Sequence, residues 1–168
     1  MNKLGHITAQ AHAGSPLGPL LLAASARGLA GIWFEGQAHH PGPIDAPEDA
    51  ADPFIAQALR ELAAYWKGEP LPFKVPLDAA GTEFQRAVWA ALRQIPRGAT
   101  RSYGEIARAS GRPAAVRAVG AAVGRNPLSV IVPCHRVLGA DGSLTGYAGG
   151  LPRKLALLRL EGVLGASA

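Results

Sequence analysis

The sequence predicts an α+β fold in two parts: a small antiparallel-sheet domain with one helix over residues 1–80, and a mainly helical domain over residues 81–168 that contains a helix-turn-helix. Strand-like apolar runs occur near the N-terminus, whereas helix-start signals dominate the second half. The charge also changes sign. Residues 1–80 carry 5 basic and 8 acidic side chains, which gives a negative net charge. Residues 81–168 carry 12 basic and 4 acidic side chains, which gives a positive one. We therefore place the domain boundary after residue 80.

In the first domain, the apolar runs 17–24 and 28–34 flank a short polar turn, which predicts a β-hairpin. A proline-rich acidic loop follows over 39–53. Apolar residues at helical spacing then predict a helix over 54–66. Residues 71–77 are predicted to form an edge strand, because their prolines cannot donate to a strand ladder.

The second domain begins with Thr82 and Gln85, a capping-box pair. We expect the helix it opens to bury Phe84, Val88 and Leu92, and to end at 95–98.

A second capping box, Ser102 with Glu105, predicts a short helix that ends near Gly111. Pro113 suits the first turn of a third helix, which runs to about Gly124. Two short helices joined by a glycine-containing turn are typical of a helix-turn-helix.

The third helix has one face of small residues. At about 100° per residue, one side gathers Ala115, Val116, Val119, Ala122 and Val123. The opposite, outer side gathers Ala114, Arg117, Ala121 and Gly124. Such a face lets a partner backbone approach closely while one arginine projects from it. An alanine-rich helix packed on both sides is the alternative.

The basic second domain indicates a nucleic-acid partner, because 11 of its 12 basic residues are arginine, which suits phosphate contacts. A general arginine-rich composition would not explain the sign reversal. No apolar run approaches the roughly 18 residues of a membrane span, so we expect no membrane association. The start of the chain lacks the apolar core of a signal peptide, and a lone cysteine suits a reducing compartment; both favour the cytoplasm.

The single cysteine, Cys134, follows an apolar segment that we expect to form a strand ending at Pro133, and it precedes His135. It is either a reactive thiol or a buried inert one, and it cannot form an intramolecular disulfide. Neighbouring residues on a strand point to opposite faces. Activation by His135 therefore requires a turn at 134–135 or a bridging water.

Glu161 is the candidate for orienting that histidine. We expect a last helix over 152–161, with Leu155, Leu157 and Leu158 inward and Gly162 as its terminator. A carboxylate in a final helical turn faces the negative end of the helix dipole. A buried partner such as His135 would compensate, although a solvated glutamate is equally compatible with the pattern.

Two loops complete the candidate site. Asn126-Pro127 is a turn signal in which the asparagine side chain bonds nearby backbone. Glycines surround Tyr147 between Cys134 and Glu161, which would let backbone approach a ligand beside one aromatic ring. A plain flexible loop is the alternative. The histidines are too scattered to predict a metal site.

Several motifs in this order resemble the O6-alkylguanine-DNA alkyltransferases. The resemblance is dense over residues 81–162 and thinner before them. It rests on Pro133-Cys134-His135-Arg136-Val137, Arg117-Ala118-Val119-Gly120, Asn126-Pro127, Gly146-Tyr147-Ala148-Gly149-Gly150, Arg153-Lys154, Leu160-Glu161-Gly162, Thr100 to Ala107, and Ser15 to Leu20.

The resemblance implies irreversible, single-turnover transfer of an alkyl group from guanine O6, and from thymine O4, to Cys134. His135 would deprotonate the thiol through a water, Glu161 would polarise the imidazole and Asn126 would brace the turn. Tyr103 would donate to the leaving guanine and crowd the phosphate. The base would be flipped out of the stack.

Further expectations concern the partner. Arg117 would enter the duplex on a helix whose small residues Ala114, Ala121 and Gly124 allow minor-groove contact. Val137, Tyr147, Ala148 and Gly149 would line the base pocket, with Ala148 standing where some members carry a serine. The resemblance implies double-stranded DNA as partner, a monomer, a ribonuclease-like support role for the first domain, and no cofactor or metal. Side-by-side binding along DNA stays open.

Two other readings remain. A non-repairing module that recognises alkylated guanine would bind DNA without transfer, although relatives of that kind replace the cysteine. A cysteine hydrolase using Cys134, His135 and Glu161 would turn over many substrate molecules.

Overall fold

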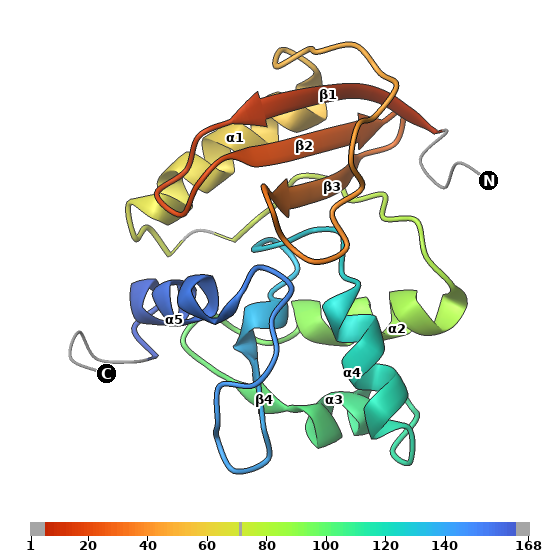
Figure 1. Ribbon diagram of the computed structural model, residues 1–168, viewed down its shortest axis with the longest axis vertical. Coiled ribbons are helices and arrows are strands. Elements are labelled where there is room, and N and C mark those ends of the chain that lie inside the picture. The colour runs from red at the N-terminus through yellow and green to blue at the C-terminus, as the bar shows by residue number, and fades with distance from the viewer. Residues whose placement is uncertain (1–5, 71, 164–168) are drawn as a thin grey trace. The chain divides into compact units, whose positions relative to one another are not determined.

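The computed structural model describes residues 6–70 and 72–163. The chain forms two compact units, Met1–Ala80 and Gly81–Ala168. The first unit holds a three-stranded antiparallel sheet and one long helix, and the second is mainly helical (Figure 1). The α+β class predicted from the sequence is confirmed.

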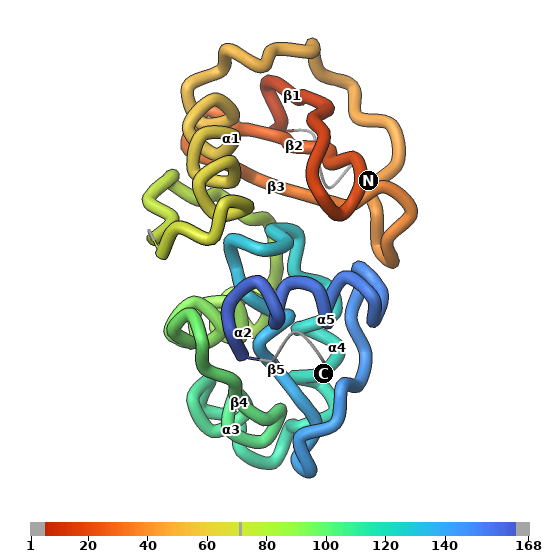
Figure 2. Tube along the Cα trace, turned by 90° about the vertical axis from the view of Figure 1, so that its left-hand side faces the viewer, coloured from red at the N-terminus to blue at the C-terminus, as the bar shows by residue number. Residues whose placement is uncertain are grey.

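The sheet of the first unit has the order β1-β2-β3, formed by β1 (Ile7–Ala13), β2 (Leu20–Ser25) and β3 (Leu29–Phe34). Helix α1 (Pro53–Trp66) lies along one face of this sheet (Figures 1 and 2). β2 and β3 are buried along their whole length. A core cluster also forms in this unit: Ile7, Leu21, Ala23, Ala30 and Trp33, with Ile44 and Ala46 of the following loop packed against it.

The predicted hairpin and α1 are confirmed, but β1 was missed. In β1, Ile7, Ala9 and Ala11 alternate with more exposed residues, and the small alanines weaken that pattern in the sequence. The predicted strand over 71–77 is wrong. Among residues 72–77 only Leu77 bridges to a strand, at Leu29, and residue 71 lies outside the described residues.

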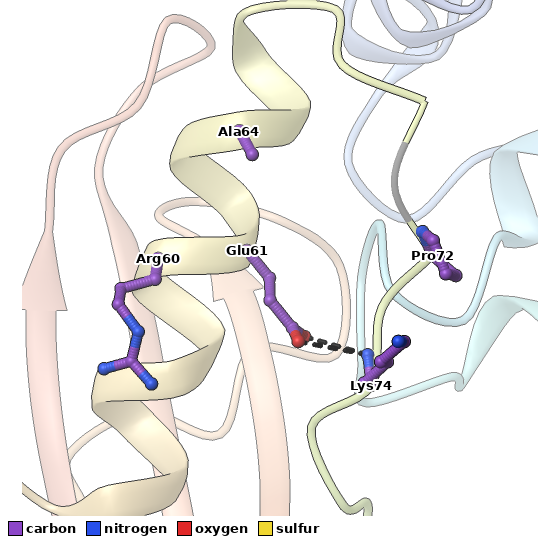
Figure 3. Close-up of a pocket in the computed structure, with 5 residues that line it drawn as sticks. All are labelled: Arg60, Glu61, Ala64, Pro72 and Lys74. Atoms are coloured by element: carbon purple, nitrogen blue, oxygen red, sulfur yellow. Dashed lines mark hydrogen bonds between the residues drawn. The ribbon is translucent and has the colours of Figure 1, made fainter.

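Figure 3 shows a pocket of the first unit between α1 and the segment that follows it. The carboxylate of Glu61 accepts hydrogen bonds from two backbone N–H groups. That of Lys74 lies 3.0 and 3.1 Å from the two carboxylate oxygens, and that of Val75 lies 3.1 Å from Oε1. Arg60, Ala64 and Pro72 complete the lining. Since the carboxylate already binds backbone, it serves to hold this segment to the helix.

The second unit contains three helices that pack on one another. They are α2 (Glu83–Arg93), α3 (Tyr103–Ala109) and α4 (Val116–Gly124). Both predicted capping boxes are present, Thr82 with Gln85 before α2 and Ser102 with Glu105 before α3. The helix-turn-helix α3–α4 is therefore confirmed.

Two details of these helices differ from the predictions. α2 buries Trp89 beside Val88 and Leu92, while Phe84 is only half-buried, beneath the guanidinium of Arg112 at 5.6 Å from its ring centre. Trp89 is held in the core because its indole N–H donates to the Ala122 carbonyl at 2.9 Å.

α4 begins three residues later than predicted. Pro113 and Ala114 form a turn, and Ala115 precedes the helix without a capping side chain. Val119, Ala122 and Val123 are buried as expected. Val116 is 41 % exposed instead of buried, because it lies in the first turn of the shortened helix.

The second unit contains four further elements among the described residues. They are β4 (Arg101–Ser102), the 3-10 turn η1 (Cys134–Arg136), β5 (Val137–Leu138) and α5 (Leu151–Leu160). η1 packs against α2 and α5. β4 pairs in parallel with β5, matching Arg101 with Val137 and Ser102 with Leu138. This pairing brings the start of α3 beside the residues that follow Cys134 (Figure 2).

Among the described residues, no helix has the length and apolar character needed to cross a bilayer.

Candidate active site

Cys134 lies at the start of η1 and is buried. The expected strand before it is wrong, because residues 129–132 form turns. Val130 in these turns has a φ of 73° and is almost fully buried. A β-branched residue in this left-handed region costs roughly 1–3 kcal/mol and persists only where its surroundings impose it. The turn is therefore held by contacts outside Val130 itself.

Asn126 supplies those contacts. Its side-chain oxygen accepts the Leu128 N–H at 3.0 Å, which is the local bond expected from the sequence. Its amide nitrogen donates to the Val132 carbonyl at 2.8 Å and to Cys134 Sγ at 3.2 Å. One buried side chain thus braces both ends of the turn and contacts the thiol.

His135 and Glu161 are hydrogen-bonded, with Nε2 and Oε2 2.8 Å apart and both side chains fully buried. Arg136 binds the same carboxylate, donating from Nε to Oε1 at 2.8 Å and from Nη2 to Oε2 at 2.9 Å. A further Arg136 nitrogen donates to the Ile95 carbonyl at 2.7 Å. Glu161 therefore closes α5 while holding two residues of η1.

The protonation states follow from this geometry. Burial raises the pKa of Glu161, but hydrogen bonds from His135 and Arg136 outweigh burial and hold that pKa far below its usual range. Burial lowers the pKa of His135, and together with the charges of Arg136 and Lys154 it outweighs the raising effect of Glu161. A neutral imidazole carries its proton on the nitrogen that faces a carboxylate, which in His135 is Nε2. Nδ1 then presents a lone pair, and it has no hydrogen-bond partner among the described residues.

Burial raises the pKa of the Cys134 thiol above its ordinary value. The hydrogen bond from Asn126, the charge of Lys154 and nearby backbone N–H groups act in the opposite direction without overcoming burial. The resting sulfur is therefore mainly a thiol, and nucleophilic attack requires a base that removes its proton.

Tyr103 opens α3, and its hydroxyl donates to the Thr145 carbonyl at 3.4 Å, a long hydrogen bond. Burial raises the pKa of this phenol, and the charge of Cys134 raises it further. The hydrogen bond to Thr145 lowers the pKa but does not cancel these effects. Tyr103 therefore keeps its proton at neutral pH and can donate it to a ligand.

The predicted pocket residues lie on β5 and on the loop before α5. Val137 is buried, Tyr147 and Ala148 are half-buried and Gly149 is buried. A Cβ at Gly149 would come within 2.7 Å of the Tyr147 ring. Glycine is therefore required there for the ring to fold back over the backbone.

The predicted partner-facing residues lie on or just before α4. Arg117 and Ala121 are exposed and Gly124 is half-buried. Ala114 is also exposed, but it belongs to the turn before the helix. Further exposed arginines, at positions 108, 112 and 125, lie on the same helix-turn-helix. The outer surface of this motif is thus basic, with small side chains around Arg117.

Both units of the chain match known protein families. Residues 10–79 match the family described as the 6-O-methylguanine DNA methyltransferase ribonuclease-like domain, and residues 83–163 match the DNA binding domain of the same name. A methylated-DNA--protein-cysteine methyltransferase of Mycobacterium leprae is 52% identical over 148 residues, covering 88% of each chain. The chain belongs to the 6-O-methylguanine DNA methyltransferase family. A relative of the same name from Methanosarcina acetivorans is 52% identical over 149 residues, covering 88% of this chain and 94% of its own.

Solved structures of the family give the same result for the fold. The crystal structure of Mycobacterium tuberculosis OGT in complex with DNA superposes with a TM-score of 0.84 at 48% identity, covering 92% of each chain. The O6-methylguanine methyltransferase of the same organism gives 0.82 at 47% identity, covering 95% of this chain and 96% of that one.

Two residues of this family member's site were missed from the sequence. Arg136 shares the Glu161 carboxylate, and Lys154 is buried in α5 beside Leu157 and Leu158. The burial of Lys154 could have been predicted from a helical wheel of α5. Lys154 precedes Leu158 by four positions and Glu161 by seven, so the three residues share one face of the helix. The expected inward residue Leu155 is instead half-buried.

Proposed function

We propose that this protein repairs DNA by moving an alkyl group from O6 of a guanine, or O4 of a thymine, to Cys134. The observation that carries the proposal is the buried chain of hydrogen bonds that joins Asn126 to the lone thiol, next to a His135 bound to Glu161. A DNA-repair methyltransferase of this family needs one such activated sulfur.

The proton of Cys134 passes to His135. Nδ1 holds the available lone pair, and a water between thiol and imidazole would relay the proton. Glu161 stabilises the imidazolium that forms, because it stays ionised beside Arg136. Asn126 donates to the sulfur as negative charge develops on it.

The sulfur then attacks the alkyl carbon. The bond from Sγ to carbon forms, the bond from carbon to O6 breaks, and its electron pair returns to the purine. The departing guanine takes up one proton, donated by Tyr103, and the proton that His135 took from the thiol then replaces the one that Tyr103 gave. The products are unmodified guanine and a thioether, for which the site contains no release chemistry, so each molecule acts once.

The base must leave the helix for this reaction, since O6 of a stacked base cannot reach a buried sulfur. We assign entry into the duplex to Arg117. The small residues Ala114, Ala121 and Gly124 around it would let α4 approach the minor groove. The flipped base would lie among Val137, Tyr147, Ala148 and Gly149, stacked on the tyrosine ring.

The two units would divide the work. Residues 81–168 would bind DNA and accept the alkyl group, and residues 1–80 would act as support. We propose that the protein works as a monomer in the cytoplasm, where a lone thiol stays reduced.

Incubation with a duplex that contains O6-methylguanine tests the function. Intact-mass and peptide mass spectrometry should show a gain of one methylene on Cys134, at one equivalent of repaired base per protein. Release of many equivalents would support a cysteine hydrolase instead. An unchanged protein mass with retained binding would support a module that recognises damage without repairing it.

Arg117→Ala should slow transfer from saturating duplex DNA by about tenfold or more, because extruding a base costs a few kcal/mol. Transfer from free O6-benzylguanine should be unchanged. Arg125→Ala is the matched control, since it removes an exposed arginine at the other end of α4. Single-turnover rates on both substrates provide the measurement, and equal losses on both would show that Arg117 does not assist flipping.

A further inference from the structure

The turn between α3 and α4 holds the backbone of Arg112 in place. Gly111 has a φ of 78°, and its N–H donates to the Arg108 carbonyl at 3.1 Å. The N–H of Arg112 donates to the Ala107 carbonyl at 2.9 Å, which completes a Schellman motif at the end of α3. The carbonyl of Arg112 accepts the Ala115 N–H at 2.9 Å, just before α4. Arg112 is therefore anchored to both helices of the helix-turn-helix.

The side chain of Arg112 is exposed, and its guanidinium carbon lies over the Phe84 ring, 5.6 Å from the ring centre. This distance is within the range of a cation–π contact, which extends to about 6 Å. Phe84 is half-buried in the first turn of α2, a helix that packs on both α3 and α4. Within the described part of the chain, no carboxylate pairs with this guanidinium and no acceptor takes a hydrogen bond from it.

An arginine stacked on a ring is well prepared to bind a phosphate group. The ring covers one face of the guanidinium, while the N–H donors point outward in its plane and match two phosphate oxygens. The contact with Phe84 restricts the side chain before binding, so less conformational freedom is lost when a ligand arrives. Arg112 also shares the exposed, basic surface of the helix-turn-helix with Arg117, five positions later, and such a surface attracts polyanions.

We propose that Arg112 binds a backbone phosphate of the duplex and that Phe84 is a positioning residue, which holds the guanidinium in place without touching DNA. The inference rests on the proposed function, which makes duplex DNA the partner. The role differs from that of Arg117, which would enter the duplex and act on the rate of transfer. A phosphate contact carries no sequence information, so Arg112 should contribute equally to the binding of damaged and undamaged duplexes.

Arg112→Ala tests the phosphate contact. We expect the affinity for an undamaged duplex to fall about tenfold, the effect of losing one charged hydrogen bond. The slope of log affinity against log salt concentration should become shallower by about 0.9, the value for one phosphate contact. Fluorescence anisotropy at several salt concentrations measures both quantities. Arg159→Ala is the matched control, because it removes an exposed arginine of α5, outside the helix-turn-helix, and it should leave the slope unchanged.

Phe84→Leu tests the positioning role while keeping an apolar side chain at this half-buried place. It should weaken binding about two- to fivefold, the range of an exposed cation–π contact. The salt slope should stay that of the wild type, because the charge of Arg112 remains. In an Arg112→Ala background, Phe84→Leu should have no further effect on affinity, since the ring then has no guanidinium to hold.

A salt slope that Arg112→Ala leaves unchanged, or a decrease that Arg159→Ala reproduces, would overturn the phosphate contact. Equal losses of affinity from Phe84→Leu in both backgrounds would overturn the positioning role. If Phe84→Leu does not fold, wild-type affinity of Arg112→Lys would overturn that role, since lysine keeps the charge but not the planar group that stacks on the ring. Wild-type protein that binds the duplex but accepts no alkyl group would instead refute the proposed function, and the salt slopes would still test Arg112.

Discussion

Replacing Cys134 by alanine should abolish alkyl transfer from both duplex DNA and free O6-benzylguanine, while DNA binding persists. The thiol is the single sulfur nucleophile of the chain, so no other cysteine can accept the group. Binding should survive because Arg117 and the small residues near it lie on the exposed surface of the helix-turn-helix. Transfer of labelled alkyl groups and fluorescence anisotropy with a damaged duplex measure the two properties.

The fold should tolerate this change. Asn126 loses its bond to the sulfur but keeps those to Val132 and Leu128, so the turn before η1 stays braced. We expect the free energy of unfolding to fall by about 1 kcal/mol, near the centre of the range for single substitutions. Cys134→Ser is the control, since it keeps a polar group of similar size at this position. Stoichiometric transfer to the alanine variant would place the acceptor on another residue.

Local signals allowed the helices of this protein to be predicted. The capping boxes at Thr82 and Ser102 satisfy backbone N–H groups within four residues, so the sequence alone specifies them. The start of α4 was less predictable, because Pro113 is compatible with a turn as well as with a first helical turn.

Long-range pairs of the site could be predicted from the residues only where one residue required another. Glu161 at the end of α5 needs a compensating partner, which led to His135. The turn that contains Val130 could not be predicted, because its left-handed conformation is imposed by Asn126 and opposes the β-branched side chain. Arg136 was missed for a similar reason, since its role depends on a carboxylate 25 positions away. Such contacts are set by tertiary packing and leave no periodic pattern.

Replacing Glu161 by glutamine should slow transfer by about a hundredfold, within the range of general-base effects. The neutral amide cannot stabilise the imidazolium of His135. The same change leaves Arg136 charged and without its carboxylate in a nearly buried position, at a cost of about 3 kcal/mol in the free energy of unfolding. Single-turnover rates and urea unfolding at neutral pH provide the measurements, with the exposed Glu83→Gln as control.

Stability should also depend on pH through this cluster. The pKa of Glu161 is lower in the folded protein than in the unfolded chain, so its contribution is complete above the unfolded value of about 4.3 and is lost as the pH falls further. The pKa of His135 is lowered too, so the unfolded chain takes up a proton first below about 6.5. The wild type should therefore lose stability on acidification from about pH 6.5, and more steeply below about pH 4. The Glu161→Gln variant should lack the steeper loss of stability below about pH 4.

The double variant Arg136→Met, Glu161→Gln separates the structural role of the carboxylate from its role in the reaction. Removing both members of a buried ion pair is often close to neutral, whereas removing one is costly. We expect the double variant to regain most of the stability lost by Glu161→Gln but none of the rate, since His135 still lacks its carboxylate. Recovery of the rate together with stability would mean that Glu161 acts only by holding α5 to η1, and that His135 needs no polarising partner.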